Sequence, residues 1–353
     1  MPKNVSYDAL KAMYEPAIEL ARLQPWEFMQ EEEAWVFKIR EQTFYAMITG
    51  SEGLSRALVM YRGEPGYRLW QDSLLGIEVA EENVAQRLDC LNVDFDLWSA
   101  LSPGDKRRLE RMGHRNEPGY WPWMTSYRPG RLPEWPDAEE TAQLTEALRA
   151  TLTIAMDIED GDDVLERPGN SDLLPVFSLD DDGEIVNVEW LPHPDVLNPP
   201  IHSQSSPLDE VGLRRLGSLR LSEGPAWEIL TGTVAIGIKD VSGEGGFFPL
   251  VAFFVREDSG FVTGVVPAPA NEMPRILSSE ILVAMERHRV RPRAFRVSQD
   301  DVESWIRPLA EALDIRIERA ERLPMAAEAL NFFRESVRNG DFEKFRREGG
   351  GGD

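Results

Sequence analysis

The sequence has few of the residues that build disulfides and metal sites. Its 353 residues include one cysteine, Cys90, and four histidines. A single cysteine excludes an internal disulfide and a Cys-based zinc site, so nothing indicates an oxidising compartment. Four histidines leave little material for another metal centre. We therefore expect no resident metal and no cofactor.

Long apolar runs are missing as well. No run approaches the roughly 20 apolar residues that a membrane helix needs. The first residues, MPKNVSYDALKAMYEP, lack the basic flank and the apolar stretch of a signal peptide. We expect a soluble, cytoplasmic protein with no membrane partner.

Basic residues are outnumbered. The chain has 62 acidic and 38 basic residues, which gives a net charge of −24. General nucleic-acid binding is not expected, because neutralising phosphates requires a basic face. Hydrophobic residues make up 42% of the chain, enough to bury the cores of two domains of ordinary size.

The charge is concentrated in one region, residues 133–184, which contains 16 acidic and two basic residues. Within it, the stretch AMDIEDGDDVLERPGNSDLLP combines glycine, proline, asparagine and aspartate in the manner of a linker. These features predict an α+β domain over residues 1–156, an acidic linker over 157–173, a mixed α/β domain over 174–342 and a flexible tail over 343–353.

Local patterns predict the elements of both domains and an overall α/β class. A helix capped by Ser6 opens the chain, and residues 34–39 and 43–49 form a hairpin. Asp137 with Glu140 three residues later is a capping box that begins a helix. Near the end of the chain, strands alternate with helices, which predicts a mixed sheet with helices against it.

No strong catalytic or cofactor motif is present. The sequence contains none of the common motifs between the strands and helices that each motif requires; those considered are GxSxG, GxGxxG, Walker A, HExxH and CxxC. This favours a protein that is not an enzyme.

The stretch 250–336 nevertheless resembles the integrase and transposase core of the RNase H-like fold. LVAFFVREDSGFVTGVVPAP is similar to that family's first two strands, RPRAFRVSQDD to the strand that carries the second acid, and LPMAAEALNFF to the helix with the final glutamate. The resemblance implies an RNase H-like sheet and, in an active member, three acids that hold two Mg²⁺ ions.

The acids are altered here. The resemblance places Arg256 at the first aspartate, Gln299 at the second, and only Glu328 matches. An arginine repels the metal that a carboxylate would attract, so two-metal chemistry should fail. If the alignment with the family is shifted by a few residues, neighbouring acids could replace the missing ones and hold Mg²⁺. The candidates for such a site are Glu328, Asp258, Asp300 and Asp301.

Most of the chain also resembles an uncharacterised bacterial family of two-domain proteins. The residues that carry this resemblance are GYWPWMTSYRPGRLPEWPDAEETAQLTEAL (119–148), RPRAFRVS and RLPMAAEAL. It implies the two-domain organisation and no activity.

An aromatic loop is the most unusual local feature. Its aromatic and arginine residues are Tyr120, Trp121, Trp123, Tyr127, Arg128 and Trp135, interleaved with prolines. Such side chains could hold an extended peptide or a glycan by stacking and cation–π contact. Alternatively, they pin a long irregular segment to its domain.

The stretch Arg287–Arg296 is the one strongly basic segment. Strand alternation places Arg291 and Arg293 on one face. We expect these arginines to be solvated or salt-bridged, with an anion or RNA contact as the alternative. The acidic region 133–184 is a further candidate partner that could cover them.

Three functions remain. The leading prediction is a non-catalytic interaction or regulatory protein with a protein or peptide partner. The alternatives are a divergent metal-dependent nuclease or phosphoryl hydrolase, with Mg²⁺ as its cofactor, and a peptide or glycan reader that uses the aromatic loop.

Overall fold

The computed structural model describes residues 5–51, 53, 55–74, 81–162, 164–165, 173–193, 210–234, 236–239 and 245–339. The chain divides into two compact units. Unit 1 comprises residues 1–79, 87–129 and 133–199, and unit 2 comprises 80–86, 130–132 and 200–353. The tail predicted over 343–353 lies outside the described residues.

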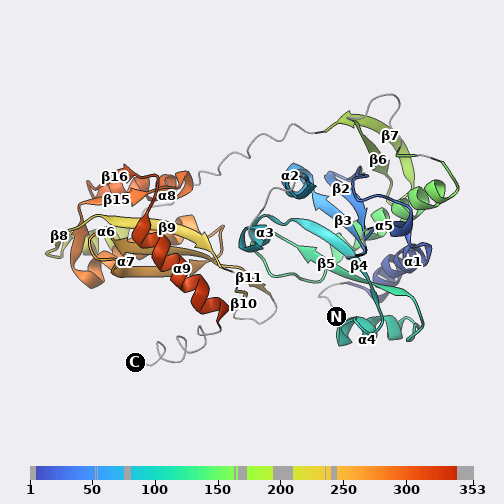
Figure 1. The fold of residues 1–353 in the computed structure, drawn as a ribbon, viewed down its shortest axis with the longest axis horizontal. Coiled ribbons are helices and arrows are strands. Elements are labelled where there is room, and N and C mark those ends of the chain that lie inside the picture. Colours follow the sequence, from blue (N-terminus) through green and yellow to red (C-terminus); the bar gives the residue numbers. More distant parts are fainter. Residues whose placement is uncertain are drawn as a thin grey trace. The chain divides into compact units, whose positions relative to one another are not determined.

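Unit 1 is built on one sheet of seven strands, in the order β5-β4-β3-β2-β1-β6-β7 (Figure 1). Strands β1 to β5 form an antiparallel meander, β6 pairs parallel to β1, and β7 pairs antiparallel to β6. Its strands are β1 (Trp35–Ile39), β2 (Gln42–Thr49), β3 (Ala57–Arg62), β4 (Cys90–Leu97), β5 (Tyr120–Tyr127), β6 (Leu173–Leu179) and β7 (Ile185–Pro192).

Helices cover both faces of this sheet. The helices of the first part of the chain are α1 (Tyr7–Leu23), the 3₁₀ turn η1 (Pro25–Glu27), α2 (Gly63–Leu74), α3 (Glu81–Arg87), α4 (Pro103–Arg111) and α5 (Ala138–Glu159). The main core joins α1 and α5 to one sheet face, and a smaller cluster joins α2 to the other. Alternation along the strands separates the two sets, because successive side chains point to opposite faces.

The predicted helix starts of unit 1 are confirmed. Ser6 Oγ accepts a hydrogen bond from Ala9 N at 3.1 Å at the start of α1. Asp137 and Glu140 form the capping box of α5. The predicted hairpin is β1 and β2.

The domain boundary differs from the prediction. Residues 173–192, predicted to begin the second domain, form β6 and β7, and β6 pairs with β1 of the first sheet through Val36–Val176 and Phe37–Phe177. The division therefore falls at residues 199–200 rather than within 157–173. Val176 and Phe177 are buried in the cores of unit 1, which places the β6–β7 hairpin in this unit. The linker-like composition of the preceding residues is compatible with this, because a loop can also connect two elements of the same domain.

Unit 2 contains a mixed sheet of five strands in the order β13-β12-β9-β15-β16. Strands β13, β12 and β9 are antiparallel, whereas β15 and β16 run parallel to β9. Two pairs of strands, β10 with β11 and β14 with β8, form separate small sheets. The strands of unit 2 are β8 (Ser222–Gly224), β9 (Trp227–Thr233), β10 (Ile238–Lys239), β11 (Gly246–Phe247), β12 (Leu250–Arg256), β13 (Val262–Ala268), β14 (Val290–Pro292), β15 (Ala294–Val297) and β16 (Arg316–Arg319).

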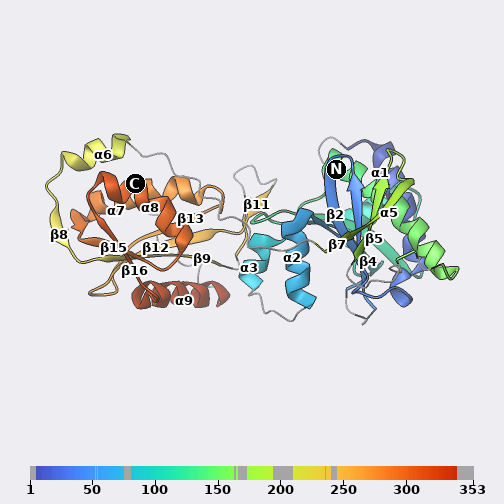
Figure 2. The same ribbon diagram turned by 90° about the horizontal axis from the view of Figure 1, so that it is seen from above.

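Helices of the later part of the chain lie on opposite faces of this sheet. They are α6 (Glu210–Gly217), α7 (Met273–His288), α8 (Asp300–Ala312) and α9 (Pro324–Arg338). Helix α3 also falls almost wholly within unit 2, in residues 80–86. Helices α7 and α8 pack on one face, and α9 packs on the other (Figure 2). The mixed α/β class expected for this part of the chain is confirmed.

Candidate functional site

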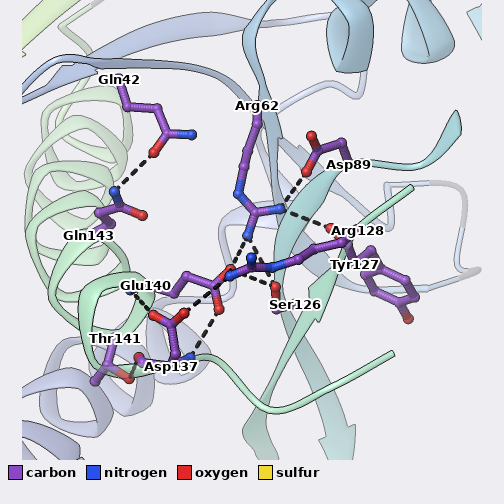
Figure 3. A network of polar contacts seen from close by, with 10 residues as sticks. All are labelled: Gln42, Arg62, Asp89, Ser126, Tyr127, Arg128, Asp137, Glu140, Thr141 and Gln143. Atoms are coloured by element: carbon purple, nitrogen blue, oxygen red, sulfur yellow. Dashed lines mark hydrogen bonds and ion pairs between the residues drawn. The ribbon is translucent and has the colours of Figure 1, made fainter. Parts of the chain in front are cut away.

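A polar network surrounds Glu140 in unit 1 (Figure 3). Glu140 is 5% exposed, and its Oε1 accepts from Arg62 Nη2 at 2.5 Å, Ser126 Oγ at 2.8 Å and Arg128 Nη2 at 2.8 Å. Its Oε2 accepts from Asp137 N at 2.9 Å. Four donors therefore compensate one buried carboxylate, which satisfies the requirement that a buried charge be paired.

Three segments far apart in the sequence supply this network. Arg62 ends β3, and its Nη1 also donates to Asp89 Oδ1 at 2.6 Å and to Tyr127 O at 2.8 Å. Glu140 lies in the first turn of α5. The capping box predicted that Glu140 lies at a helix start, but its ion pair with Arg62, 78 residues earlier, could not be predicted from any local pattern.

Two adjoining hollows lie beside the network, with volumes of about 300 Å³ and 480 Å³. They share Gln42, Glu139 and Gln143 in their walls. The remaining lining residues are Arg62, Asp89, Arg128, Pro129, Asp137 and Glu140 in the first, and Ile39, Arg40 and Glu41 in the second. Carboxylates outnumber guanidinium groups in these walls, which favours a cation over an anion.

The predicted aromatic loop is in fact largely an edge strand, β5, paired with β4. Pro122 is compatible with this position because an edge strand tolerates a missing N–H. Trp121 is buried and its Nε1 donates to Glu117 O at 3.2 Å. Trp135 stacks on Tyr14 and lies under the guanidinium of Arg108, at 3.9 Å from Arg108 Cζ to the ring centroid.

The other members of this stretch are engaged within unit 1 too. Tyr120 packs edge-on against Trp26, and the guanidinium of Arg56 lies over its ring. Burial raises the pKa of Tyr127 to about 12. Arg128 is paired with acidic side chains of α5 and its cap. These contacts are those expected of structural bracing.

Asp94, on β4 directly opposite Trp123 of β5, is an unusual carboxyl. Burial raises its pKa to about 7, although a hydrogen bond from Asn92 lowers the pKa and nearby Asp96 raises it further. Trp123 Nε1 donates to Asp96 rather than to Asp94, at 2.8 Å. Asp94 is thus a half-buried titratable group that has no ion pair with any described residue.

Asp94 should make stability pH-dependent. The folded pKa lies above the usual value, so between the two values the folded state retains a proton that the unfolded state has lost, and stability falls as pH rises. Asp94→Asn removes this penalty, and its advantage over the wild type should grow by about 1–2 kcal/mol between about pH 5.5 and pH 8. Urea unfolding at both pH values measures it, and a pH-independent difference would contradict the assignment.

The four acids proposed for a metal site do not gather in one place. Asp258 follows β12, which ends opposite the start of β9, since Arg256 pairs with Trp227. Asp300 and Asp301 follow Gln299, whose side chain bonds to Thr231 near the other end of β9. About five residues of strand, or roughly 15 Å, separate the two ends, so these acids cannot bridge ions about 4 Å apart.

Three of these acids have other contacts or lie in solvent. Asp258 accepts two hydrogen bonds from Arg256, at 3.1 and 2.9 Å, which hold its pKa below the usual range. Asp300 pairs with Arg319. Glu328 is exposed on α9. Among the described residues, no three histidines, cysteines or acids lie close enough to hold a metal ion.

Gln299, which the resemblance to the integrase core places at the second acid, binds the backbone of β9. Its Oε1 accepts from Thr231 N at 2.9 Å and Thr231 Oγ1 at 3.1 Å, and its Nε2 donates to Thr231 O at 3.1 Å. The amide therefore fixes the end of β15 to the central strand, where a carboxylate would be repelled by the carbonyl.

Three arginines of the stretch Arg287–Arg296 are salt-bridged or bonded to backbone within unit 2. Arg293 and Arg296 both bond to Glu257, at 3.2 and 2.6 Å, and Arg291 donates to the carbonyls of Leu313 and Asp314. The suggested cover by residues 133–184 would join the two units and stays a prediction.

An apolar groove of about 330 Å³ lies in unit 2 between β13 and α9. Phe332 is 66% exposed and Val265 is 42% exposed at its rim. The groove is lined by Phe253, Val262, Val265, Ala329, Phe332, Phe333 and Ser336. Large apolar side chains rarely stay this exposed together unless something covers them.

Comparison with protein-family models gives a match for each unit. Residues 11–175 match a domain of unknown function, DUF7309, and residues 212–334 match another, DUF6930. The resemblance to an uncharacterised two-domain family is thereby confirmed. Neither the curated proteins nor the solved structures give a match. No helix among the described residues is long and apolar enough to cross a membrane.

Proposed function

We propose that this protein, which joins a DUF7309 domain to a DUF6930 domain, is a non-catalytic interaction protein. Its unit 2 binds an amphipathic helix of a partner protein in the groove between β13 and α9. The observation that carries this proposal is the exposed ring of Phe332 beside the apolar groove. Burying a phenylalanine side chain is worth about 1.5–3 kcal/mol, so a partner that covers this ring gains affinity.

The charges around the groove favour a basic partner. Glu328 and Glu335 lie four residues before and three residues after Phe332, and residues at this spacing share a helix face. Both carboxylates are exposed, and neither has an ion pair within the described part of the chain. They would attract lysine or arginine at the edges of an apolar helix face.

The edge strand favours a helix over an added strand as the occupant. Strand β13 includes Pro267, which has no N–H to donate to a neighbouring strand. The pairing of β13 with β12 is also irregular at Phe254 and Val255. An amphipathic helix needs no backbone hydrogen bonds from the groove and uses only its apolar face.

We also propose that unit 2 retains an RNase H-like sheet without its metal chemistry. Three antiparallel strands, followed by two strands parallel to the central one and connected through α7 and α8, support this fold. The binding of Gln299 to Thr231 and the dispersed acids argue against two-metal catalysis. Both observations therefore argue against the nuclease alternative.

A model peptide tests the groove. We expect a fluorescein-labelled amphipathic helix of roughly 18 residues, with leucines at helical spacing and lysines elsewhere, to bind the full chain. Phe332→Ser should weaken the affinity about tenfold or more, because the ring is the most exposed apolar contact. Fluorescence anisotropy at physiological ionic strength measures the dissociation constants.

Two controls separate the groove from general attraction to an acidic chain. Val283→Ser removes another exposed apolar side chain, 38% exposed on α7, and should leave the affinity unchanged. The double variant Glu328→Gln/Glu335→Gln should weaken binding a few-fold, whereas Glu311→Gln on α8 should not. Equal affinities for the wild type and Phe332→Ser would reject the groove as the binding surface.

A further inference from the structure

A hollow at one end of the unit 2 sheet is a second candidate site. Its volume is about 260 Å³, and its wall comes from the start of β9, the end of β12, the start of β13 and the end of α7. This volume lies just below the range of about 300–1,000 Å³ typical of ligand pockets, so the ligand must be small. The residues that line it are Trp227, Arg256, Phe261, Thr263, His288 and Val290. The apolar groove has other lining residues, so the two sites are independent.

Trp227 brings an unpaired donor to this wall. Its side chain is fully buried, and its Nε1 has no hydrogen-bond partner among the described residues. The N–H group of a buried tryptophan normally finds an acceptor, because an unpaired one loses the hydrogen bond that it makes to water in the unfolded chain. A ligand atom that accepts from Nε1 would supply the missing partner.

The exposed parts of the wall control access to this indole. Arg256 lies directly opposite Trp227 in the pairing of β12 with β9, and its side chain is 34% exposed. Phe261 is 52% exposed. Side chains with this much exposure can rotate without disturbing the core, so a small ligand can displace them and reach the indole.

The charges of the wall favour an anion. No acidic residue is among those that line the hollow, whereas Arg256 is. Arg256 donates to Asp258 through Nε and Nη2, which leaves Nη1 without a hydrogen bond to any described residue. Arg287 and Arg289, on either side of His288, are exposed and have no ion pair in the described parts of the chain. These positive charges attract an anion to the hollow, although the whole chain is acidic.

Two rings form the other side of the wall. Phe261 packs edge-on against His288, with 5.6 Å between the ring centroids. His288 Nε2 donates to Thr263 O at 3.1 Å, since a carbonyl oxygen only accepts, and this bond fixes the imidazole beside Phe261. An aromatic ligand gains stacking or edge contacts with such rings. The wall therefore suits a ligand that joins an aromatic body to an anionic acceptor.

We propose that this hollow binds a small aromatic carboxylate. Its carboxylate accepts from Trp227 Nε1 and Arg256 Nη1, and its ring lies against Phe261 and His288. A carboxylate suits these donors because its two oxygens accept hydrogen bonds at the same time. Inorganic phosphate fits less well, because it has no apolar body for the two rings to contact.

The indole N–H signal of Trp227 in a nuclear magnetic resonance spectrum tests the site directly. In the full chain labelled with ¹⁵N-tryptophan, the signal that disappears in Trp227→Phe belongs to this residue. Titration with phenylacetate should move that signal downfield and reach saturation, because the N–H gains a charged acceptor. Phenylacetamide has nearly the same shape without the charge and should bind at least about tenfold more weakly.

Trp305 and Arg275 provide matched controls. Trp305 Nε1 is also buried and unpaired in the same core, but Trp305 does not line the hollow, so its signal should stay in place. Arg256→Gln should weaken phenylacetate binding about tenfold. Arg275→Gln removes another arginine paired with an acidic neighbour, 13 residues and roughly 20 Å along α7 from His288, and should leave the affinity unchanged.

Three results would overturn the proposal. The first is a Trp227 signal that stays in place at millimolar phenylacetate, or that moves no more than the Trp305 signal. The second is equal binding of phenylacetate and phenylacetamide, which would show that no charge is recognised. The third is equal losses in Arg256→Gln and Arg275→Gln, which would show only general attraction to arginines. Both arginine variants change exposed side chains and should fold normally, which thermal unfolding checks.

Discussion

Replacing Glu140 with alanine should lower the free energy of unfolding by about 3–5 kcal/mol, the largest single effect we expect. The carboxylate is buried and accepts four hydrogen bonds, two of them from arginines. Without it, Asp89 is the one acidic partner that the Arg62 guanidinium keeps within the described part of the chain. A buried charge that loses its partner costs more than the pair contributes when intact.

Urea unfolding followed by circular dichroism and tryptophan fluorescence measures this effect. Glu139→Ala is the matched control, because Glu139 is the preceding residue, is exposed and has no ion pair within the described chain. Its cost should stay below about 1 kcal/mol, the size of a favourable charge at a helix N-terminus. Similar losses for the two variants would show that the network contributes little beyond the helix dipole.

Glu228→Ala should cost about 2–4 kcal/mol and is the second large effect. Glu228 is on β9, is fully buried, and its Oε2 accepts from Ala326 N at 2.9 Å. That N–H belongs to the first turn of α9, whose N-cap residue Leu323 provides no side-chain hydrogen bond. A glutamate from the sheet therefore caps the helix, and its removal leaves a buried donor unpaired together with a cavity.

Two comparisons identify the cause of that loss. Glu228→Gln retains the shape and an acceptor oxygen, so it should cost clearly less than the alanine variant. Glu257→Ala breaks the partly exposed pairs with Arg293 and Arg296 and should cost about 1 kcal/mol or less. If the glutamine and alanine variants of Glu228 were equally stable, the cap would not be the source of the effect.

The sequence predicted the features that depend on neighbouring residues. Ser6 and the pair Asp137 and Glu140 mark helix starts because a cap involves only residues three apart. The β1–β2 hairpin is likewise local. Short-range hydrogen bonds and periodic burial therefore explain what was anticipated.

Features that depend on distant residues were not anticipated. The pairing of β6 with β1 joins residues about 140 positions apart, so the acidic composition before β6 suggested a domain boundary instead. The aromatic segment seemed irregular because of its prolines, yet its position at the sheet edge allows Pro122 in a strand. Propensity alone does not reveal which strands are edges.

The apolar groove also depends on residues that are distant in the sequence. The groove needs β13 beside α9, and Phe332 and Phe333 alone look like ordinary core residues of a helix. Glu328 was singled out as a weak candidate for a catalytic acid, and it lies on the exposed side of α9, four residues before Phe332. Only the packing of α9 on the sheet distinguishes these roles.

Hydrogen–deuterium exchange of the full chain, with and without the leucine–lysine peptide, tests the interaction function most directly. We predict slower amide exchange in residues 262–268 and 325–338 on binding, and none of this protection in Phe332→Ser. Protection confined to residues 120–135 would instead favour a peptide reader built on the aromatic strand. That result, or no protection anywhere at saturating peptide, would contradict binding at the groove.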